Sequence, residues 1–205
     1  MTTFTFSIPP VSFGEAFENV LGRSPGEADG EVGLYLTWIP SPIGPLLAGA
    51  TRNGICMLEH SQPSTLASQV AEAGKRLNLP TLAGRNEHLK RLEDELAMYF
   101  EGRLQKFTVP LVTPGTPFQQ KVWDALAKIP YGEVRSYREI ARQLGTPQAS
   151  RAVGQANGNN RIMIAIPCHR VVNHDGQLGG YAYGLDIKRQ LLDLEKGILP
   201  SMPTA

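Results

Sequence analysis

The sequence predicts a mixed α/β (α+β) fold, with a small antiparallel sheet and helices in the first half and a mostly helical second half that contains a helix-turn-helix. Alternating apolar segments on either side of Asn53-Gly54 indicate strands joined by a hairpin. Amphipathic segments that begin with capping residues indicate helices in both halves. Thr113-Pro114-Gly115 has the composition of a linker, so we expect an N-terminal arm at 1–30, one domain at 31–114 and another at 115–205.

Length and composition are those of a globular protein. The 205 residues, 41% of them hydrophobic, can form one or two packed cores. The N-terminus has no charged region followed by an apolar run, and no apolar stretch approaches the roughly 20 residues that cross a bilayer, so we expect a cytoplasmic protein. Two cysteines, Cys56 and Cys168, cannot by themselves form a disulfide framework or a zinc cluster.

Charge is unevenly distributed along the chain. Residues 1–115 carry 9 Lys and Arg against 12 Asp and Glu, a net charge of −3, whereas residues 116–205 carry 11 against 7, a net charge of +4. Local potential steers association more than total charge does. The asymmetry therefore favours an anionic partner for the second half.

The first half contains few residues that suggest chemistry. Residues 1–30 show no sustained periodicity and are expected to be irregular. Strands are predicted at 34–39 and 46–51, and a third at 55–58 follows the Asn53-Gly54 turn. Cys56 lies inside this third strand between apolar neighbours and is interpreted as a core residue.

Two helices and one more strand complete the predicted first domain. The helices span about 63–77 and 86–101, and Asn86 caps the second. Lys106 to Val112 has a strand pattern. The helices are expected to cover the sheet.

The second half opens with a series of short helices. Thr116 and Pro117 form a cap and first-turn pair ahead of an apolar stripe. Ser136 and Glu139 have the spacing of a capping box, and that helix runs to Gly145. Thr146 and Pro147 repeat the cap and proline signal for a helix that ends near Gly158.

The last two of these helices have the proportions of a helix-turn-helix, whose second helix usually reads nucleic acid. Apart from Val153 and Arg151 the second helix carries only small or short polar side chains. Small residues let a backbone approach either a neighbouring helix or a narrow groove, and both alternatives stay open. The long cationic Arg151 favours the groove.

A reactive centre is suggested by Cys168-His169, which follow the strand-like run Ile162–Ile166 and Pro167. The alternative is a small buried thiol beside a core histidine. A helix beginning near Asp186 places Glu195 on its apolar stripe, where a carboxylate needs a partner unless the helix end is exposed. If Glu195 is buried, it could orient His169 as the base for Cys168.

Two loops flank this centre. The run Asn157–Asn160 is a dense turn signal in which the asparagine side chains are expected to bond backbone. Downstream, Gly179–Gly184 is a glycine-rich aromatic loop that either lines a pocket for a flat ligand or is a plain connector.

Several motifs in this chain occur together in one known family. They are Phe118 with Trp123, Pro130-Tyr131-Gly132-Glu133-Val134, Ser136-Tyr137, Arg151-Ala152-Val153-Gly154, Asn160, Ile166-Pro167-Cys168-His169-Arg170-Val171, Gly180-Tyr181 and Glu195. With these motifs the chain resembles the O6-alkylguanine-DNA alkyltransferases, also called methylated-DNA–protein-cysteine methyltransferases, over about residues 85–197. The resemblance implies a ribonuclease H-like first domain and a second domain that binds DNA and accepts the alkyl group.

The resemblance implies a role for each matching residue. Cys168 would accept the alkyl group as a thiolate, His169 would deprotonate it through a bound water, and Glu195 would orient His169. Tyr137 would donate to a ring nitrogen of the leaving guanine. Asn160 would brace the turn after the recognition helix.

Further matches concern DNA and the base. Arg151 would enter the duplex in place of a flipped nucleotide while its helix lies in the minor groove. The remaining residues that the resemblance places against DNA are Arg138, Thr146, Ala152, Gly154 and His174, together with Tyr137. Those that it places around the base are Tyr181, Ala182, Tyr183 and Val171.

The activity implied is DNA repair by direct transfer of the alkyl group from O6-alkylguanine to Cys168, with O4-alkylthymine as a further candidate substrate. The thioether has no evident route back to a thiol, so each molecule would react once. Double-stranded DNA is the expected partner, no cofactor is expected, and nothing suggests more than a monomer.

Two departures and two alternatives accompany this hypothesis. Tyr183 stands where some members have a small residue, which predicts slow reaction with bulky O6-benzylguanine, and the first half has no four-ligand zinc set. The first alternative is a DNA-binding regulator without chemistry. Non-catalytic relatives of this kind have another residue in place of the acceptor cysteine, whereas this chain keeps Cys168. A cysteine hydrolase would need an oxyanion hole, for which the sequence shows no signature.

Overall fold

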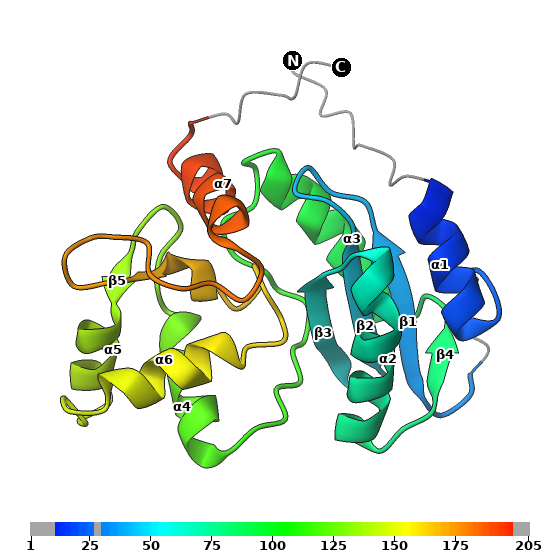
Figure 1. Ribbon diagram of the computed structural model, residues 1–205, viewed down its shortest axis with the longest axis horizontal. Helices are drawn as coiled ribbons and strands as arrows, with labels where there is room; N and C mark the ends of the chain where they lie inside the picture. Colours follow the sequence, from blue (N-terminus) through cyan, green and yellow to red (C-terminus); the bar gives the residue numbers. More distant parts are fainter. Residues whose placement is uncertain (1–10, 27–29, 199–205) are drawn as a thin grey trace. The chain divides into compact units, whose positions relative to one another are not determined.

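The computed structural model describes residues 11–26 and 30–198. The chain divides into two compact units, Met1–Pro114 and Gly115–Ala205 (Figure 1). Across the described ranges, no helix is both long enough and apolar enough to cross a membrane.

The first unit is built on a four-stranded sheet in the order β3-β2-β1-β4. Its strands are β1 (Leu34–Ile39), β2 (Leu46–Thr51), β3 (Gly54–His60) and β4 (Thr81–Ala83). The first three pair antiparallel as predicted, with Tyr35 opposite Ala50, and Gly49 opposite Met57. The edge strand β4 pairs parallel with β1 and was not predicted, because three residues are too few to show a period of two.

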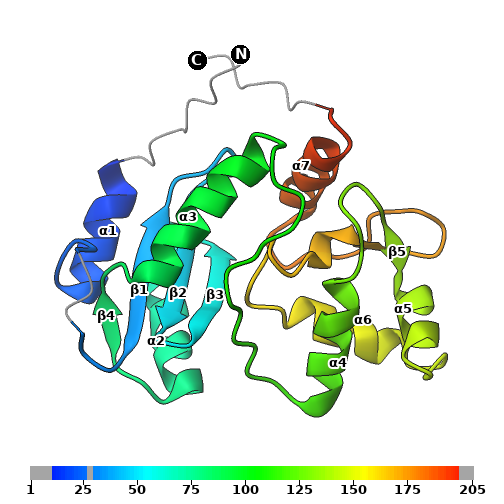
Figure 2. The same cartoon turned by 180° about the vertical axis from the view of Figure 1, so that it is seen from behind.

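Helices cover both faces of this sheet. Helix α2 (Pro63–Leu77) lies on one face and α3 (Glu87–Phe100) on the other, as the two opposite views show (Figures 1 and 2). Asn86 caps α3 by accepting a hydrogen bond from the Leu89 amide at 3.0 Å. Cys56 lies in the apolar core between the sheet and α2, where burial raises the pKa of its thiol to about 11, so it has no nucleophilic character at neutral pH.

The prediction of an irregular arm at residues 1–30 is wrong where the structure describes that segment. Residues Val11–Leu21 form helix α1. Phe13 and Phe17, one helical turn apart, are both fully buried and belong to the core of the first unit. The surrounding Pro and Gly residues obscured this short apolar stripe, while residues 1–10 and 27–29 lie outside the described part of the chain.

The strand predicted at Lys106–Val112 is also wrong. Only a single bridge joins Leu111 to Ile55, with hydrogen bonds from the Ile55 amide to the Pro110 carbonyl at 2.8 Å and from the Val112 amide to the Ile55 carbonyl at 2.7 Å. Pro110 has no amide to continue a ladder. The amides of Thr108 and Val109 instead donate to the buried Glu95 carboxylate.

The second unit is mostly helical. Its helices are α4 (Pro117–Leu126), α5 (Tyr137–Gln143), α6 (Ser150–Gly158) and α7 (Leu185–Glu195). Capping boxes join Thr116 to Gln119 at α4 and Ser136 to Glu139 at α5. Helix α6 packs against both α4 and α5, and the Trp123 indole of α4 donates to the Ala156 carbonyl of α6 at 2.9 Å, which fixes the helix-turn-helix.

Two details of this unit differ from the predictions. Thr146 does not cap α6: its hydroxyl turns back toward the Ala141 carbonyl at the end of α5, and α6 begins only after Ala149. Residues 162–166 form turns and no strand, because hydrogen bonds within the segment, such as Ile166 amide to Ile162 carbonyl at 3.0 Å, replace a ladder. The strands present are the short parallel pair β5 (Arg135–Ser136) and β6 (Val171–Val172).

Candidate active site

Cys168 opens a short 3-10 helix, η1 (Cys168–Arg170), directly after Pro167. Its side chain is only 3% exposed and lies at a pocket of about 210 Å³. The residues that line this pocket are Tyr137, Gly154, Asn157, Gly158, Asn160, Cys168, Gly180, Tyr181, Ala182 and Tyr183. Pockets for drug-sized ligands hold about 300–1,000 Å³, so this one suits a smaller, single-ring or two-ring group.

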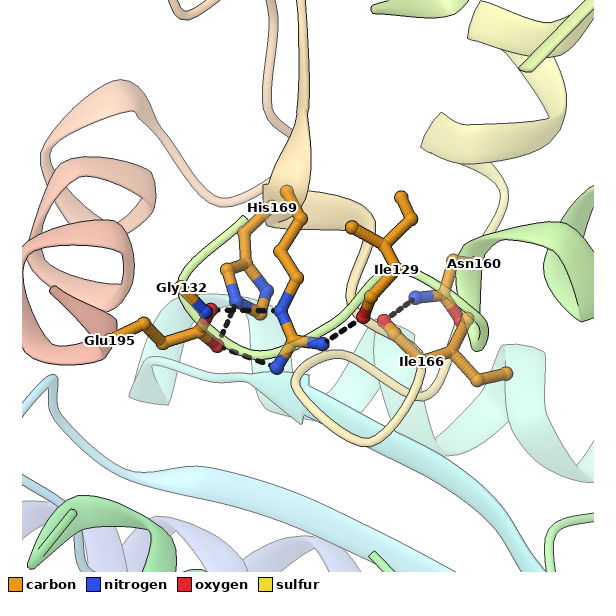
Figure 3. A network of polar contacts seen from close by, with 7 residues as sticks. Ile129, Gly132, Asn160, Ile166, His169 and Glu195 are labelled. Carbon is orange, nitrogen blue, oxygen red and sulfur yellow. Dashed lines mark hydrogen bonds and ion pairs between the residues drawn. The ribbon is translucent and has the colours of Figure 1, made fainter. Parts of the chain in front are cut away.

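The segment that leads to Cys168 is fixed by Asn160. The Asn160 amide nitrogen donates to the Ile166 carbonyl at 2.9 Å (Figure 3). Its amide oxygen accepts from the Ile162 amide at 3.0 Å. Asn160 is 3% exposed, so these bonds are shielded from water. The end of α6 is thereby joined to the turns that carry the cysteine.

His169 and Glu195 form the pair that the sequence suggested. His169 Nε2 lies 2.7 Å from Glu195 Oε1, and both side chains are buried (Figure 3). The other ring nitrogen, Nδ1, has no hydrogen-bond partner among the described residues. Glu195 is therefore not a frayed exposed carboxylate but the acceptor for His169.

The same carboxylate is held from two more sides. Arg170 donates from Nε to Glu195 Oε2 at 2.8 Å and from Nη2 to Oε1 at 2.9 Å. The Gly132 amide also donates to Oε2, at 3.1 Å. Each oxygen of Glu195 thus has two donors, which compensates for its burial.

Burial sets the protonation states of the centre. It raises the pKa of the Cys168 thiol, although hydrogen bonds from Asn160 and Tyr181 and the nearby Lys188 cation act in the opposite direction. Burial also lowers the pKa of His169, against the attraction of Glu195. The resting centre at neutral pH is therefore a thiol beside an uncharged imidazole, which is the pairing that general base activation requires.

Tyr137 faces this centre from the first turn of α5. Desolvation, followed by the charge on Cys168, raises the pKa of its phenol, so the hydroxyl keeps its proton and can donate it to a ligand. Tyr181 and Tyr183 pack edge to face, with ring centroids 5.5 Å apart, and close another side of the pocket. The glycine-rich loop is therefore part of the pocket wall and not a plain connector.

The residues that were expected to meet DNA lie mainly on the surface of the second unit. Arg138, Thr146, Arg151 and His174 are exposed, whereas Ala152 is half-buried. Gly154 is also half-buried and lines the pocket, where a Cβ on it would lie 3.8 Å from the Tyr137 ring. Helix α6, which carries mostly small side chains, therefore contains both the exposed Arg151 and residues that line the Cys168 pocket.

Val171 was expected in the pocket, but its side chain is fully buried in β6 and does not line it. Val171 pairs with Arg135 in the β5–β6 sheet, and its side chain is buried in the core of the second unit. Its carbonyl has another task, since it accepts a hydrogen bond from Lys188 Nζ at 2.6 Å.

Sequence reasoning missed three residues of the site. Arg170 was assigned only to a sequence motif, because an arginine next to a predicted base does not by itself indicate that it pairs with Glu195. Lys188 is fully buried and donates to the Val171 and Leu178 carbonyls. Asn157, which lines the pocket, was expected to bond backbone, yet its buried side-chain oxygen has no partner among the described residues.

Within residues 11–26 and 30–198, no group of three or more His, Cys, Asp or Glu side chains has the arrangement of a metal site.

The chain is similar to known proteins in sequence and in fold. The description "6-O-methylguanine DNA methyltransferase, ribonuclease-like domain" matches residues 34–113, and "6-O-methylguanine DNA methyltransferase, DNA binding domain" matches residues 117–197. The chain is 44% identical over 167 residues to the methylated-DNA–protein-cysteine methyltransferase of Methanosarcina barkeri, covering 81% of this chain and 99% of the relative. It is also 44% identical over 171 residues to the protein of that name from Mycobacterium bovis, covering 82% of this chain and 96% of the relative.

A solved structure agrees with these sequence matches. The crystal structure of Mycobacterium tuberculosis OGT in complex with DNA superimposes with a TM-score of 0.68 at 42% identity, covering 81% of this chain and 95% of that chain. The similarity therefore extends over both units.

Proposed function

The chain belongs to the 6-O-methylguanine DNA methyltransferase family, and from that premise we propose that Cys168 is the residue that takes up the alkyl group. The protein is a methylated-DNA–protein-cysteine methyltransferase, which repairs DNA by direct alkyl transfer. The observation that carries the assignment of Cys168 is its place at the pocket, next in the chain to a buried histidine that is held by Glu195.

The chemistry follows from the protonation states. The Cys168 thiol gives its proton to His169, whose Nδ1 is free of other described partners. The thiolate electron pair forms the S–C bond to the alkyl carbon while the C–O6 bond breaks and its electrons pass to guanine O6. Tyr137 donates a hydrogen bond to the guanine ring nitrogen that becomes more basic as the C–O6 bond breaks. The proton that His169 accepted from Cys168 balances the one that the guanine takes up, so the products are unmodified guanine and S-alkylcysteine.

The other residues have supporting roles in this proposal. Asn160 fixes the turn before Cys168, and Tyr181, Ala182 and Tyr183 enclose the flipped base. Arg151 takes the place of that base in the duplex, while Arg138, Thr146, Ala152, Gly154 and His174 contact the DNA around it. O4-alkylthymine is a further candidate substrate. We expect the protein to act as a monomer in the cytoplasm, bound to the nucleoid if its source is bacterial.

Mass spectrometry after incubation with a duplex that contains O6-methylguanine tests the proposal. The protein should gain one methyl group at Cys168 and should not react again. Cys168→Ser should bind the duplex without a mass change, and Cys56→Ser, a matched control at the other cysteine, should gain the methyl group. Methylation at a residue other than Cys168 would refute the assignment, and an unchanged mass with intact binding would instead support a regulator without chemistry.

A further inference from the structure

We propose that Arg170 is a positioning residue for alkyl transfer: by holding both oxygens of Glu195 it keeps His169 oriented and uncharged, and therefore able to act as the base. The inference rests on the proposed function, because it concerns the same centre. It goes further because it assigns a role to Arg170, which the proposed function places neither in contact with DNA nor in the pocket wall.

The first argument is the geometry of the guanidinium. Arg170 is 5% exposed, and its Nη1 donates to the Ile129 carbonyl at 2.6 Å while Nε and Nη2 grip Glu195 (Figure 3). The Tyr131 ring lies 5.7 Å from its Cζ. The planar guanidinium of Arg170, held by these contacts, orients the carboxylate far better than the single rotatable ammonium of a lysine would.

The second argument concerns the ring of His169. Burial raises the pKa of Glu195, but the hydrogen bonds from His169 and then from Arg170 outweigh it and hold that pKa well below its usual range, at about 2. An ionised carboxylate only accepts hydrogen bonds, so the proton in the 2.7 Å contact must lie on His169 Nε2. The lone pair is then on Nδ1, and this tautomer can accept a proton from the thiol.

The third argument is the balance of buried charge. Glu195 and Arg170 together are neutral, so a protonated His169 would leave an uncompensated positive charge in the core. Without Arg170, the glutamate would pair with an imidazolium, and the base would already carry its proton. Of the other groups that face the ring, Lys188 on α7 also opposes an imidazolium, whereas Tyr131 and Cys168 are uncharged at neutral pH.

The pH dependence of single-turnover methyl transfer distinguishes this role from a structural one. In Arg170→Met, the decline of the rate on the acid side should move up by about one pH unit or more, as expected when an opposing charge near a titrating group is removed. The rate should then fall on the acid side of neutral pH and recover at alkaline pH. Arg170→Lys keeps the charge but not the fork, so it should retain the wild-type profile at a lower plateau.

Arg189→Met is the matched control, because it removes an exposed arginine of α7 that lies outside the site. Its profile should equal that of the wild type. If Arg170→Met loses the same factor of rate at every pH, Arg170 only supports the fold and the inference is overturned.

A second measurement does not depend on activity or on a folded Arg170→Met variant. NMR titration of His169 should show a neutral ring with its proton on Nε2 in the wild type at neutral pH, and the same pKa in Arg170→Lys, which keeps the positive charge. A wild-type His169 that is protonated at neutral pH, or that carries its proton on Nδ1, would overturn the inference even if Cys168 is methylated. A neutral His169 with no methylation of Cys168 would uphold this inference and overturn the proposed function alone.

Discussion

At the level of single residues, two aromatic rings limit the space around Cys168. Tyr183 lines the pocket and packs edge to face against Tyr181. We expect its side chain to occupy space that a bulky substituent on the base would need. We therefore predict that Tyr183 restricts the size of the transferred group without taking part in the chemistry.

Replacement of this ring should widen the substrate range. Tyr183→Gly should increase the rate of transfer from O6-benzylguanine about tenfold or more, since accommodation of a larger apolar group in a pocket changes discrimination by about 10–200-fold. The rate with O6-methylguanine in DNA should change little. Single-turnover assays with both substrates measure the ratio, and an unchanged benzyl rate would show that Tyr183 does not narrow the pocket.

Asn157 is a second residue whose position gives a prediction. It is 5% exposed, lines the pocket, and has a buried side-chain oxygen without a described partner. An unsatisfied buried polar group costs about 1–3 kcal/mol. Asn157→Ala should therefore leave the melting temperature unchanged or raise it, while it slows methyl transfer. A loss of thermal stability with a normal transfer rate would identify Asn157 as a purely structural residue.

At the level of elements, the sequence predicted most helices and strands because each had a local signal. The capping boxes of α4 and α5 and the Asn86 cap of α3 satisfy amides that lack helical partners, so those starts were predicted to the residue. Thr146 shows the limit of this reasoning, since its hydroxyl was taken by the preceding helix. Strand β4 and the pair β5–β6 depend on partners far away in the sequence, which no local pattern shows.

The candidate site divides in the same way. A motif placed Cys168 beside His169, and helical spacing placed Glu195 on a buried face. The fork of Arg170, the carbonyls bound by Lys188 and the unpaired oxygen of Asn157 arise only when separate segments meet. Residue type alone could not reveal these contacts, because a surface arginine, lysine or asparagine would have the same local pattern.

Helix α1 yields a test of an element that the sequence did not predict. Phe17 is fully buried, so Phe17→Ala should lower the free energy of unfolding of the first unit by about 3–5 kcal/mol. Val20 on the same helix is 36% exposed, and Val20→Ala should cost less than about 0.5 kcal/mol. Denaturant titration measures both, and equal small losses would mean that α1 does not contribute to the core in solution.

The turn at residues 130–133, which contacts the end of α7, requires a glycine at position 132. Gly132 has a φ of 76°, and a Cβ on it would approach the Glu195 carbonyl to 3.0 Å. Gly132→Ala should therefore cost more than the roughly 1–2 kcal/mol of left-handed backbone strain. Gly145→Ala is the matched control, because its φ is 71° but no atom crowds the new methyl group. Thermal unfolding should rank the two variants in that order, and equal losses would exclude crowding at Gly132.

At the scale of the whole molecule, charge is arranged so that the second unit meets DNA. Its net charge of +4 contrasts with −3 for the first 115 residues. Helix α6 presents the exposed Arg151, and its half-buried Gly154 reaches the pocket of Cys168. We therefore propose that different parts of one helix-turn-helix bind the DNA backbone and receive the flipped base.

Different dependence on salt should separate these two tasks. Each phosphate contact changes the slope of log affinity against log salt by about 0.9. Arg138→Ala, which removes a proposed phosphate contact, should make this slope shallower by about 1 and weaken binding of damaged and intact duplexes equally. Arg103→Ala removes an exposed arginine of the first unit and should leave the slope unchanged.

Arg151→Ala should behave differently, because its side chain is proposed to replace the flipped nucleotide. Loss of that support leaves the unstacking cost of a few kcal/mol uncompensated. The rate of methyl transfer at saturating duplex should therefore fall by a larger factor than the affinity does, and a single-stranded substrate, which needs no flipping, should recover most of the lost rate. Equal losses of rate on double-stranded and single-stranded substrates would show that Arg151 does not act by replacing the flipped nucleotide.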